Sequence, residues 1–383
     1  MDKVGLVTLW RANYGSALQC YATKHILQSL GYSCVLVERR EKSAPVHFLK
    51  RVENRLYRFY LLLTNIHMVH DINAVAGTGK HQANLAMPKA LDEFAKQKLC
   101  PRYFSSAELK RLGKAKEYTA FLSGSDQVWN GACIDRWMMG FLLFAPWKKR
   151  IAFAPSFGSD WIQKYNRRRY KKYISGFRAL SARESGAAIC IEQLTGRHCE
   201  LVLDPVLQLS REAWIAILEK EHIPPRGEKR YVVACFLDAP SEQAVSYVQS
   251  TGELLSAEIV VLPTDHPAFS TIPHSVFSEG PFEFLRLMES ADFIVTDSFH
   301  TTAFALCFER PFFAFRRQYT HAFDQSARIV SMLKLFDMEE RFSTGSALPD
   351  PTMPVVYEKV ASKMDSHRIA AKEYLVNALS TGA

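Results

Sequence analysis

Residues 4–31 have the sequence VGLVTLWRANYGSALQCYATKHILQSLG, which predicts a strand, a polar loop and a helix in that order. Residues 4–9 form an apolar run of strand length. Between Ala17 and Leu30 the apolar side chains recur at helical spacing, and Gly31 provides the stop signal. Similar strand-then-helix units recur along the chain, which indicates an α/β fold with parallel sheets.

Further β-branched and apolar runs predict strands in two series. The first comprises residues 34–38, 120–123, 151–154, 179–182 and 201–203, and the second comprises residues 231–237, 259–262, 293–296 and 312–315. A polar helix and the turn-rich stretch PPRGE at residues 224–228 lie between the two series. We therefore predict an N-terminal domain over residues 1–210, a C-terminal domain over residues 211–356, and a terminal helix within residues 357–383.

Residues 43–95 interrupt the alternation of strands and helices. We interpret them as a helical insertion packed on the first domain. Within the insertion, residues 48–69 combine aromatic and aliphatic side chains with four Lys or Arg residues. This composition also fits a basic amphipathic segment that lies on a membrane surface.

The composition is that of a folded globular protein and excludes a disordered chain, a collagen-like chain and a disulfide miniprotein. The chain has 383 residues, of which 48% are hydrophobic and 23% charged, and a formal net charge of +9.

The sequence contains neither an apolar stretch of about 20 residues nor a signal-peptide pattern at its start, so we expect a cytoplasmic protein. Its eight cysteines include no C-x-x-C pair, so we expect no disulfide framework and no metal site. The positive net charge favours acidic partners such as phosphorylated metabolites or anionic lipid. Because the sequence contains no nucleic-acid-binding signature, we expect no nucleic acid partner.

Four polar loops follow predicted strands, where ligands bind in open α/β sheets. In the first, Gly15 allows a close approach of the backbone and the following helix start favours an anion, although Asn13 could simply cap that helix. In the second, Asp126 could accept a proton from a hydroxyl, while Gln127 and Trp129 suit the polar edge and apolar face of a sugar. The alternative is an Asx-turn at Asp126 and a core tryptophan.

The third and fourth loops carry a candidate anion-binding residue and a candidate proton-transfer residue. Arg183 could hold a carboxylate or phosphate in a two-pronged contact, or form a surface ion pair. His300 follows a strand and stands beside Asp297, Ser298 and Thr301. Histidine side chains exchange protons near neutral pH, so we expect His300 to move protons. The sequence lacks G-x-S-x-G, a Walker lysine motif and H-E-x-x-H.

Taken together, the loops resemble those of the polysaccharide pyruvyl transferase family. The matching motifs, in family order, are NYG at 13–15, GSDQVW at 124–129, APSFG at 154–158, RE at 183–184, DPV at 204–206 and TDSFH at 296–300. The resemblance implies two Rossmann-like domains that face each other across a cleft, similar to GT-B glycosyltransferases, with the terminal helix packing back on the first domain. The sequence departs from the family at Thr301, where relatives often carry Gly after the His.

The resemblance also implies an activity: transfer of the pyruvyl group of phosphoenolpyruvate to two hydroxyls of one sugar, which gives a cyclic ketal and phosphate. Under this hypothesis, His300 is the acid and Asp126 is the base or a sugar anchor. The expected donor-binding residues are Arg183, Ser298, Thr301, Asn13, Gly15 and Arg316 (or Arg317), and the expected acceptor-binding residues are Gln127, Trp129 and Asp297. Apart from phosphoenolpyruvate as co-substrate, we expect no cofactor and no metal.

The acceptor is expected to be a saccharide, in a lipid-linked polysaccharide precursor on the inner membrane face. Two alternatives remain open at this point. One is a glycosyltransferase of the same architecture that uses a nucleotide sugar. The other is a catalytically silent saccharide-binding module.

Overall fold

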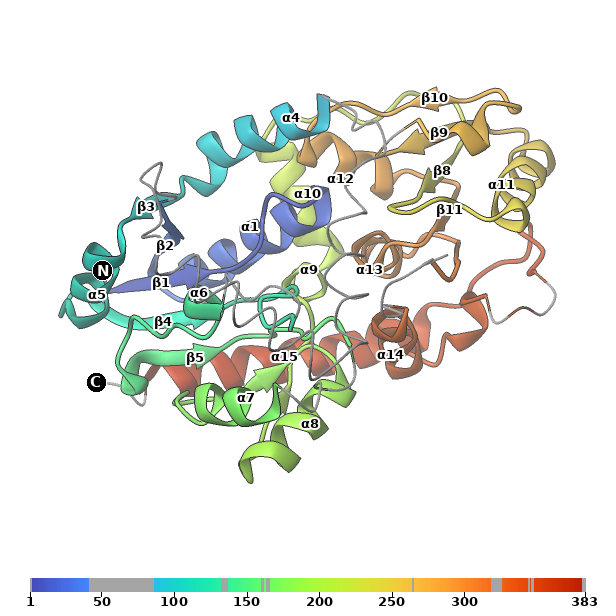
Figure 1. The fold of residues 1–383 in the computed structure, drawn as a ribbon. Helices are drawn as coiled ribbons and strands as arrows, with labels where there is room; N and C mark the ends of the chain where they lie inside the picture. Colours follow the sequence, from blue (N-terminus) through green and yellow to red (C-terminus); the bar gives the residue numbers. More distant parts are fainter. Residues whose placement is uncertain are drawn as a thin grey trace, which may run out of the picture.

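The chain folds into two parallel α/β units joined by a helical linker and bridged by a long terminal helix (Figure 1). The computed structural model describes residues 2–40, 86–131, 137–159, 162, 166–263, 265–317, 326–343, 345 and 348–380. The predicted membrane-contacting segment, residues 48–69, lies outside the described residues, as does most of the predicted insertion.

The first sheet has the strand order β3-β2-β1-β4-β5, and all of its strand pairs are parallel. Its strands are β1 (Lys3–Val7), β2 (Ser33–Arg39), β3 (Arg102–Phe104), β4 (Tyr118–Ser123) and β5 (Arg150–Ala152). A two-stranded sheet of β6 (Ser181–Ala182) and β7 (Glu200–Leu201) continues this layer through a bridge between Ile151 and Ala179. Buried apolar residues fill β1 and β4, as expected for parallel strands covered on both faces.

Helices cover this sheet and lead back between its strands. They are α1 (Tyr14–Ser29), α4 (Ala86–Phe94), the π-helix η1 (Ala95–Leu99), α5 (Ser106–Lys114), α6 (Trp137–Gly140), the 3₁₀-helix η3 (Trp147–Lys149), α7 (Arg167–Ile174) and α8 (Ser185–Thr195). A reciprocal capping box of Asn13 and Ser16 starts α1, which fixes where the first loop ends. Residues 86–95 of the predicted insertion are helical.

The second sheet repeats the design, with the order β10-β9-β8-β11-β12 and parallel pairing throughout. Its strands are β8 (Tyr231–Cys235), β9 (Glu258–Leu262), β10 (Ser275–Val276), β11 (Phe293–Thr296) and β12 (Phe312–Ala314). The linker between the two units contains α9 (Pro205–Gln208) and α10 (Arg211–Lys220). The helices that follow β8 are α11 (Glu242–Leu255), η4 (Pro267–Phe269), α12 (Pro281–Glu289), α13 (Phe299–Cys307), α14 (Ala327–Leu335), η5 (Glu339–Arg341) and α15 (Glu358–Ser380). The predicted α/β class with parallel sheets is therefore confirmed.

The terminal helix α15 leaves the second unit and returns along the first, as Figure 1 shows beneath β5. Tyr374 donates a hydrogen bond to the carbonyl of Ala152, and Arg368 donates to the carbonyl of Leu207. Leu375 of α15 is fully buried in a core cluster that contains residues of both sheets. The prediction that the terminal helix packs back on the first domain is confirmed.

Candidate active site

The two units meet where α1 and α13 begin. Each helix follows a strand, β1 in the first unit and β11 in the second, so both helix starts lie at the carboxyl edges of their sheets. Gly15 in the first turn of α1 lies against His300 in the first turn of α13: a Cβ atom placed on Gly15 would be 2.2 Å from Cβ of His300. Glycine is therefore required for this approach, because any larger side chain would overlap the histidine.

A buried carboxylate stands at the centre of the site. Asp204 precedes α9 and caps it, accepting a hydrogen bond from the backbone N–H of Val206 at Oδ1. Its Oδ2 accepts hydrogen bonds from Nη1 of Arg183 and from Oγ of Ser125, both at 2.8 Å. Sequence reasoning placed Asp204 in a family motif but gave it no role.

His300 reaches the same carboxylate oxygen from the second unit. Its Nε2 lies 3.6 Å from Oδ2 of Asp204, which is longer than a hydrogen bond. Among the described residues this buried nitrogen has no hydrogen-bond partner. The structure thus brings Arg183 and His300, predicted from separate loops, to one oxygen atom.

Arg183 is a buried residue held by two carboxylates, not a surface ion pair. Its Nε donates to Oε1 of Glu184 at 2.8 Å, in addition to the bond to Asp204. Burial alone would lower the pKa of Arg183, but Glu184 and Asp204 raise it above its usual value. Burial likewise would raise the pKa of Asp204, yet His300 and Arg183 hold it well below its usual range. The Nη2 atom of Arg183 has no hydrogen-bond partner among the described residues and can therefore donate to a ligand.

Arg328 on α14 is a second buried guanidinium that sequence reasoning missed. The ring of Phe299 lies 4.1 Å from Cζ of Arg183 and 5.8 Å from Cζ of Arg328. Burial, together with the positive charges of Arg183 and Arg317, lowers the pKa of Arg328 to about 10. An anion bound beside Arg328 would offset this unfavourable environment.

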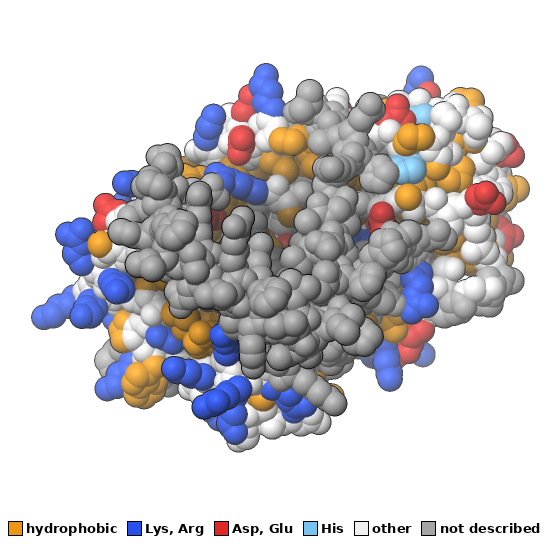
Figure 2. All heavy atoms as spheres, viewed as in Figure 1, with side chains coloured by type: hydrophobic (Ala, Val, Ile, Leu, Met, Phe, Trp, Pro, Cys, Tyr) orange, Lys and Arg blue, Asp and Glu red, His pale blue; other side chains and the backbone are white. Residues whose placement is uncertain are grey.

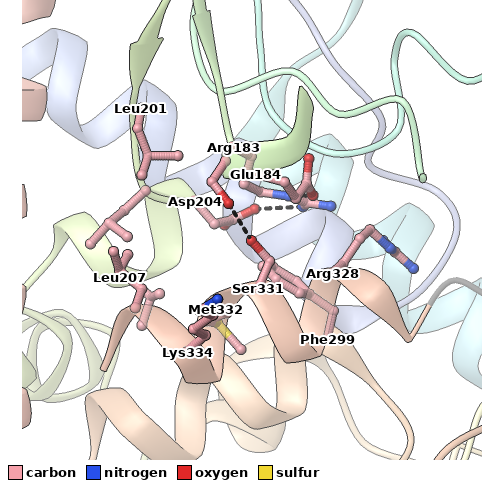
Figure 3. Close-up of a pocket in the computed structure, with 13 residues that line it drawn as sticks. Arg183, Glu184, Leu201, Asp204, Leu207, Phe299, Arg328, Ser331, Met332 and Lys334 are labelled. Carbon is pink, nitrogen blue, oxygen red and sulfur yellow. Dashed lines mark hydrogen bonds and ion pairs between the residues drawn. The ribbon is translucent and has the colours of Figure 1, made fainter. Parts of the chain in front are cut away.

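A cavity of about 280 Å³ opens beside these residues, between β6, β7 and α9 on one side and α13 and α14 on the other (Figure 3). Its polar lining includes Arg183, Asp204 and Arg328. Its apolar lining consists of Leu201, Leu203, Leu207, Phe299, Met332 and Leu335. Across the cavity, Oγ of Ser185 and Oγ of Ser331 lie 3.2 Å apart. His300 borders the Arg183–Asp204 cluster but does not line this cavity.

The second loop turns at Asp126, which has a φ of +67° and is buried. Its Oδ1 accepts a hydrogen bond from the backbone N–H of Gln127, and its negative charge helps to raise the pKa of Arg183. Asp126 therefore belongs to the electrostatic surroundings of the cluster. The amide oxygen of Gln127 accepts a hydrogen bond from Asn130 at 2.6 Å.

The expectation that Trp129 presents its face to a sugar is wrong. Its side chain is fully buried, its indole N–H donates to the carbonyl of Gly140 at 2.9 Å, and its ring stacks on Phe141. Packing in the core removes this ring from any ligand, so the alternative of a core tryptophan is the correct one.

The expectation that Asp297 binds the acceptor is also wrong. Its two carboxylate oxygens accept hydrogen bonds from the backbone N–H groups of Leu237 and Asp238, at 2.8 and 3.1 Å. Burial raises the pKa of Asp297, while Arg317, 3.4 Å from its Oδ2, opposes this rise. Asp297 therefore fixes the loop after β8.

The remaining predicted donor-binding residues also have contacts within the protein. Ser298 caps α13 by accepting from the N–H of Thr301, and the Thr301 hydroxyl donates to Sγ of Cys235 at 3.1 Å. Asn13 caps α1. Arg316 is exposed after β12. Their contacts with a donor stay predictions.

Two parallel α/β units, with a buried arginine, carboxylate and histidine at their junction, define a two-domain α/β fold with a candidate site between the units. In fold, the chain is similar to UDP-GlcNAc 2-epimerase from Methanocaldococcus jannaschii in complex with UDP-GlcNAc and UDP, at 10% identity, covering 99% of this chain and 100% of that chain with a TM-score of 0.50. UDP-GlcNAc 2-epimerase from Neisseria meningitidis bound to UDP-GlcNAc matches at 11% identity, 98% and 100% coverage and a TM-score of 0.48. The fold is GT-B, as predicted.

A family model for polysaccharide pyruvyl transferase matches residues 13–319. The chain belongs to the polysaccharide pyruvyl transferase family, which confirms the resemblance seen in the sequence motifs. No curated protein sequence matches the chain. Within the described part of the chain, no helix has the length and apolar character needed to cross a membrane.

Proposed function

We propose that this protein transfers the pyruvyl group of phosphoenolpyruvate to two hydroxyls of a sugar unit, forming a cyclic ketal. The proposed acceptor is a saccharide in a lipid-linked polysaccharide precursor. Family membership supports the reaction class, and the observation that carries the site assignment is the convergence of His300 and Arg183 on Oδ2 of Asp204.

The reaction needs one proton on carbon and releases inorganic phosphate. The enol CH₂ takes a proton and becomes CH₃, and the oxygens of the two sugar hydroxyls bond to the central carbon while its C–O bond to phosphate breaks. The two hydroxyls release two protons in total. One equals the proton that the CH₂ carbon takes up to become CH₃, and the other leaves on inorganic phosphate. A general acid and a base must therefore flank the same carbon.

We assign the acid to His300. Its Nε2 lies beside the buried carboxylate of Asp204, which supplies the negative charge that an imidazolium needs during proton transfer. Asp126 is the proposed base or sugar anchor. Support comes from the burial of Asp126 and from its electrostatic interaction with Arg183 and Arg328.

The donor would be held by its negative charges. Phosphoenolpyruvate carries a carboxylate and a phosphate, about −2.5 to −3 in total near neutral pH. Burial and the positive charges of Arg183 and Arg317 lower the pKa of Arg328, which an anion would offset, and Arg183 retains Nη2 for a ligand. The adjoining starts of α1 and α13 add partial positive charge.

The decisive experiment incubates the protein with phosphoenolpyruvate and candidate lipid-linked saccharides. We expect phosphate release together with a pyruvyl mass increment on the saccharide. His300→Gln should lower kcat by about 100-fold or more, the usual contribution of a general acid. The matched control is His266→Gln, which changes a partly exposed histidine that caps η4 and should keep the activity.

Two outcomes would contradict the proposal. If His300→Gln turned over phosphoenolpyruvate at the wild-type rate, the acid would be another group. If nucleotide sugars released nucleoside diphosphate while phosphoenolpyruvate stayed intact, the protein would be a glycosyltransferase.

A further inference from the structure

A basic surface surrounds an exposed tryptophan on the first unit. Trp147 in η3 is 59% exposed, and exposed lysines and arginines of α5, η3 and α7 flank it. We name this region the Trp147 surface; its members are Lys110, Arg111, Lys114, Lys116, Trp147, Lys148, Arg167, Arg168, Lys171 and Lys172. Figure 2 shows Lys and Arg side chains gathered over the regions where Figure 1 places α5 and α7.

Contacts between the three elements bring the C-terminal ends of α5 and α7 next to η3. Nζ of Lys149 in η3 donates to the carbonyl of Ala115, just after α5, at 2.7 Å. A Cβ placed on Gly113 of α5 would lie 2.3 Å from the carbonyl oxygen of Phe144. On the other side, the Arg150 guanidinium lies against Gly176, two residues beyond the end of α7. η3 therefore sits between the end of α5 and the end of α7.

Helix electrostatics explains only part of this charge. Lysines and arginines in the last turns of α5 and α7 are favourable beside the negative ends of those helices. Arg167 and Arg168, however, stand in the first turn of α7, where the helix dipole disfavours cations and where no acidic residue is present. Two acids that the structure describes near α5 are engaged in other contacts: Glu108 closes the capping box of α5, and Glu117 pairs with Lys3 at 3.2 Å.

The combination of charge and an exposed indole fits one kind of partner. Anionic lipid headgroups attract clustered lysines and arginines, and tryptophan favours the boundary between headgroups and acyl chains. A soluble polyanion would use the charges but would gain little from an exposed indole. We propose that the Trp147 surface docks this protein on an anionic membrane, with Trp147 entering the interfacial layer.

The surface lies away from the candidate active site. Its centre is at the amino edge of the first sheet, where β4 and β5 begin, whereas His300 lies at the carboxyl edges. The proposal does not use residues 48–69 and does not depend on the proposed function. Substitutions on the surface should therefore leave activity on a soluble acceptor unchanged.

The test is co-sedimentation of the full chain with vesicles of phosphatidylglycerol and phosphatidylcholine, compared with phosphatidylcholine alone. We expect binding to the anionic vesicles at low salt and its loss at high salt. Arg168→Ala combined with Lys172→Ala should weaken vesicle binding by about 10- to 30-fold, from the contribution of each charge near the surface. Trp147→Ser should weaken it further.

Matched controls come from exposed residues on other elements. Lys220→Ala combined with Lys359→Ala removes two exposed charges, and Leu254→Ser removes an apolar side chain that is 61% exposed. These variants should bind vesicles as the wild type does, and thermal melts should show that all variants are folded.

Three results would overturn the proposal. The first is failure of the wild type to sediment with anionic vesicles at low salt. The second is equal weakening by the control variants. The third is binding to soluble polyanions as strong as to vesicles and unaffected by Trp147→Ser, which would assign the surface to a polyanion instead of a membrane.

Discussion

At the scale of single residues, Asp204 is the carboxylate on which the candidate site depends. It is fully buried, and Arg183 and Ser125 donate to the same oxygen that His300 approaches. Neutralising Asp204 leaves the buried charge of Arg183 with Glu184 as its paired carboxylate, and breaking a buried ion pair costs about 3–5 kcal/mol. We expect Asp204→Asn to lower the free energy of unfolding by about this amount and to abolish activity.

The effect of Asp204 on stability should depend on pH. Because its pKa is lower in the folded than in the unfolded protein, its contribution is complete above the unfolded pKa of about 3.9 and is lost as the pH falls below that value. Urea unfolding should show a larger difference between wild type and Asp204→Asn at neutral pH than near pH 3. Ser125→Ala removes one hydrogen bond to the same carboxylate without removing the charge, so it should cost less, about 1.5–3 kcal/mol at neutral pH, and this cost should fade over the same acidic range.

Arg328 provides a direct test of donor binding. In the absence of ligand, its buried charge is destabilised by Arg183 and Arg317. Arg328→Met should therefore lose the increase in melting temperature that phosphoenolpyruvate gives the wild type, about 2.7 kcal/mol of stabilisation at 100 times Kd.

A matched control for this ligand effect is Arg286→Met, which removes a buried arginine from α12 that pairs with Glu289. We expect it to melt below the wild type but to keep the shift produced by phosphoenolpyruvate. A full shift in Arg328→Met would show that the donor binds elsewhere.

The residues of the site were predictable from the sequence to different degrees. His300 and Arg183 follow strands within polar loops, so their position at a sheet edge could be predicted. Arg328 gave no such signal, because it lies within a helix whose placement beside Arg183 depends on how the two units pack. For Trp129 and Asp297 the residue types fitted a ligand, but only the structure shows that Gly140 and the backbone after β8 already occupy their polar atoms.

At the scale of elements, the contact of α1 with α13 sets the distance between the two units at the site. Gly15→Ala would add a methyl group where only 2.2 Å is available beside Cβ of His300. We expect the two helices to separate, with activity falling by about 100-fold because misplacement of a catalytic group by about 1 Å has that effect. Gly227→Ala, where a Cβ would meet no described atom within 4 Å, is the control and should remain active.

A second test at this scale concerns the join between α8 and β7. His198 follows α8 and lies 2.9 Å from Glu192 and 3.0 Å from Glu200, which together raise its pKa. The stabilisation it gives is therefore present below its unfolded pKa of about 6.5 and is lost as the pH rises through the higher folded value.

The difference in denaturation midpoint between wild type and His198→Gln should be greatest in mildly acidic solution and should vanish at alkaline pH. Because the pair is exposed, we expect the difference to be small and to shrink in high salt. A difference that grew with pH would contradict the assignment.

Most strands could be predicted from the sequence because their apolar runs are long enough to be distinctive, as at residues 231–235 and 293–296. The edge strands β3 and β10 were missed. They have three and two residues, and exposed side chains dominate both, so they carry no hydrophobic pattern. Their pairing depends on the neighbouring strands β2 and β9.

At the scale of the whole molecule, one hydrophobic core cluster is shared by the two units, while two further clusters lie within the first and the second unit. A single cluster of buried residues includes Val4 of β1, Val233 of β8 and Leu375 of α15. Tyr14 of α1 stacks on Phe284 of α12 and donates to the carbonyl of Glu279 at 2.9 Å. The connection between the units is therefore apolar and extensive, which favours unfolding as one cooperative structure over independent unfolding of two domains.

Leu375→Ala tests this cooperativity. The side chain is fully buried where α15 returns to the first unit, so its truncation should lower the free energy of unfolding by about 2–5 kcal/mol. If the core is shared, calorimetry should show a single transition for the wild type and a single transition at lower temperature for the variant. Val376→Ala, which truncates the adjacent side chain that is 43% exposed, should leave the transition nearly unchanged. Two transitions, of which only one moves, would show that the units unfold separately and that α15 stabilises the first unit alone.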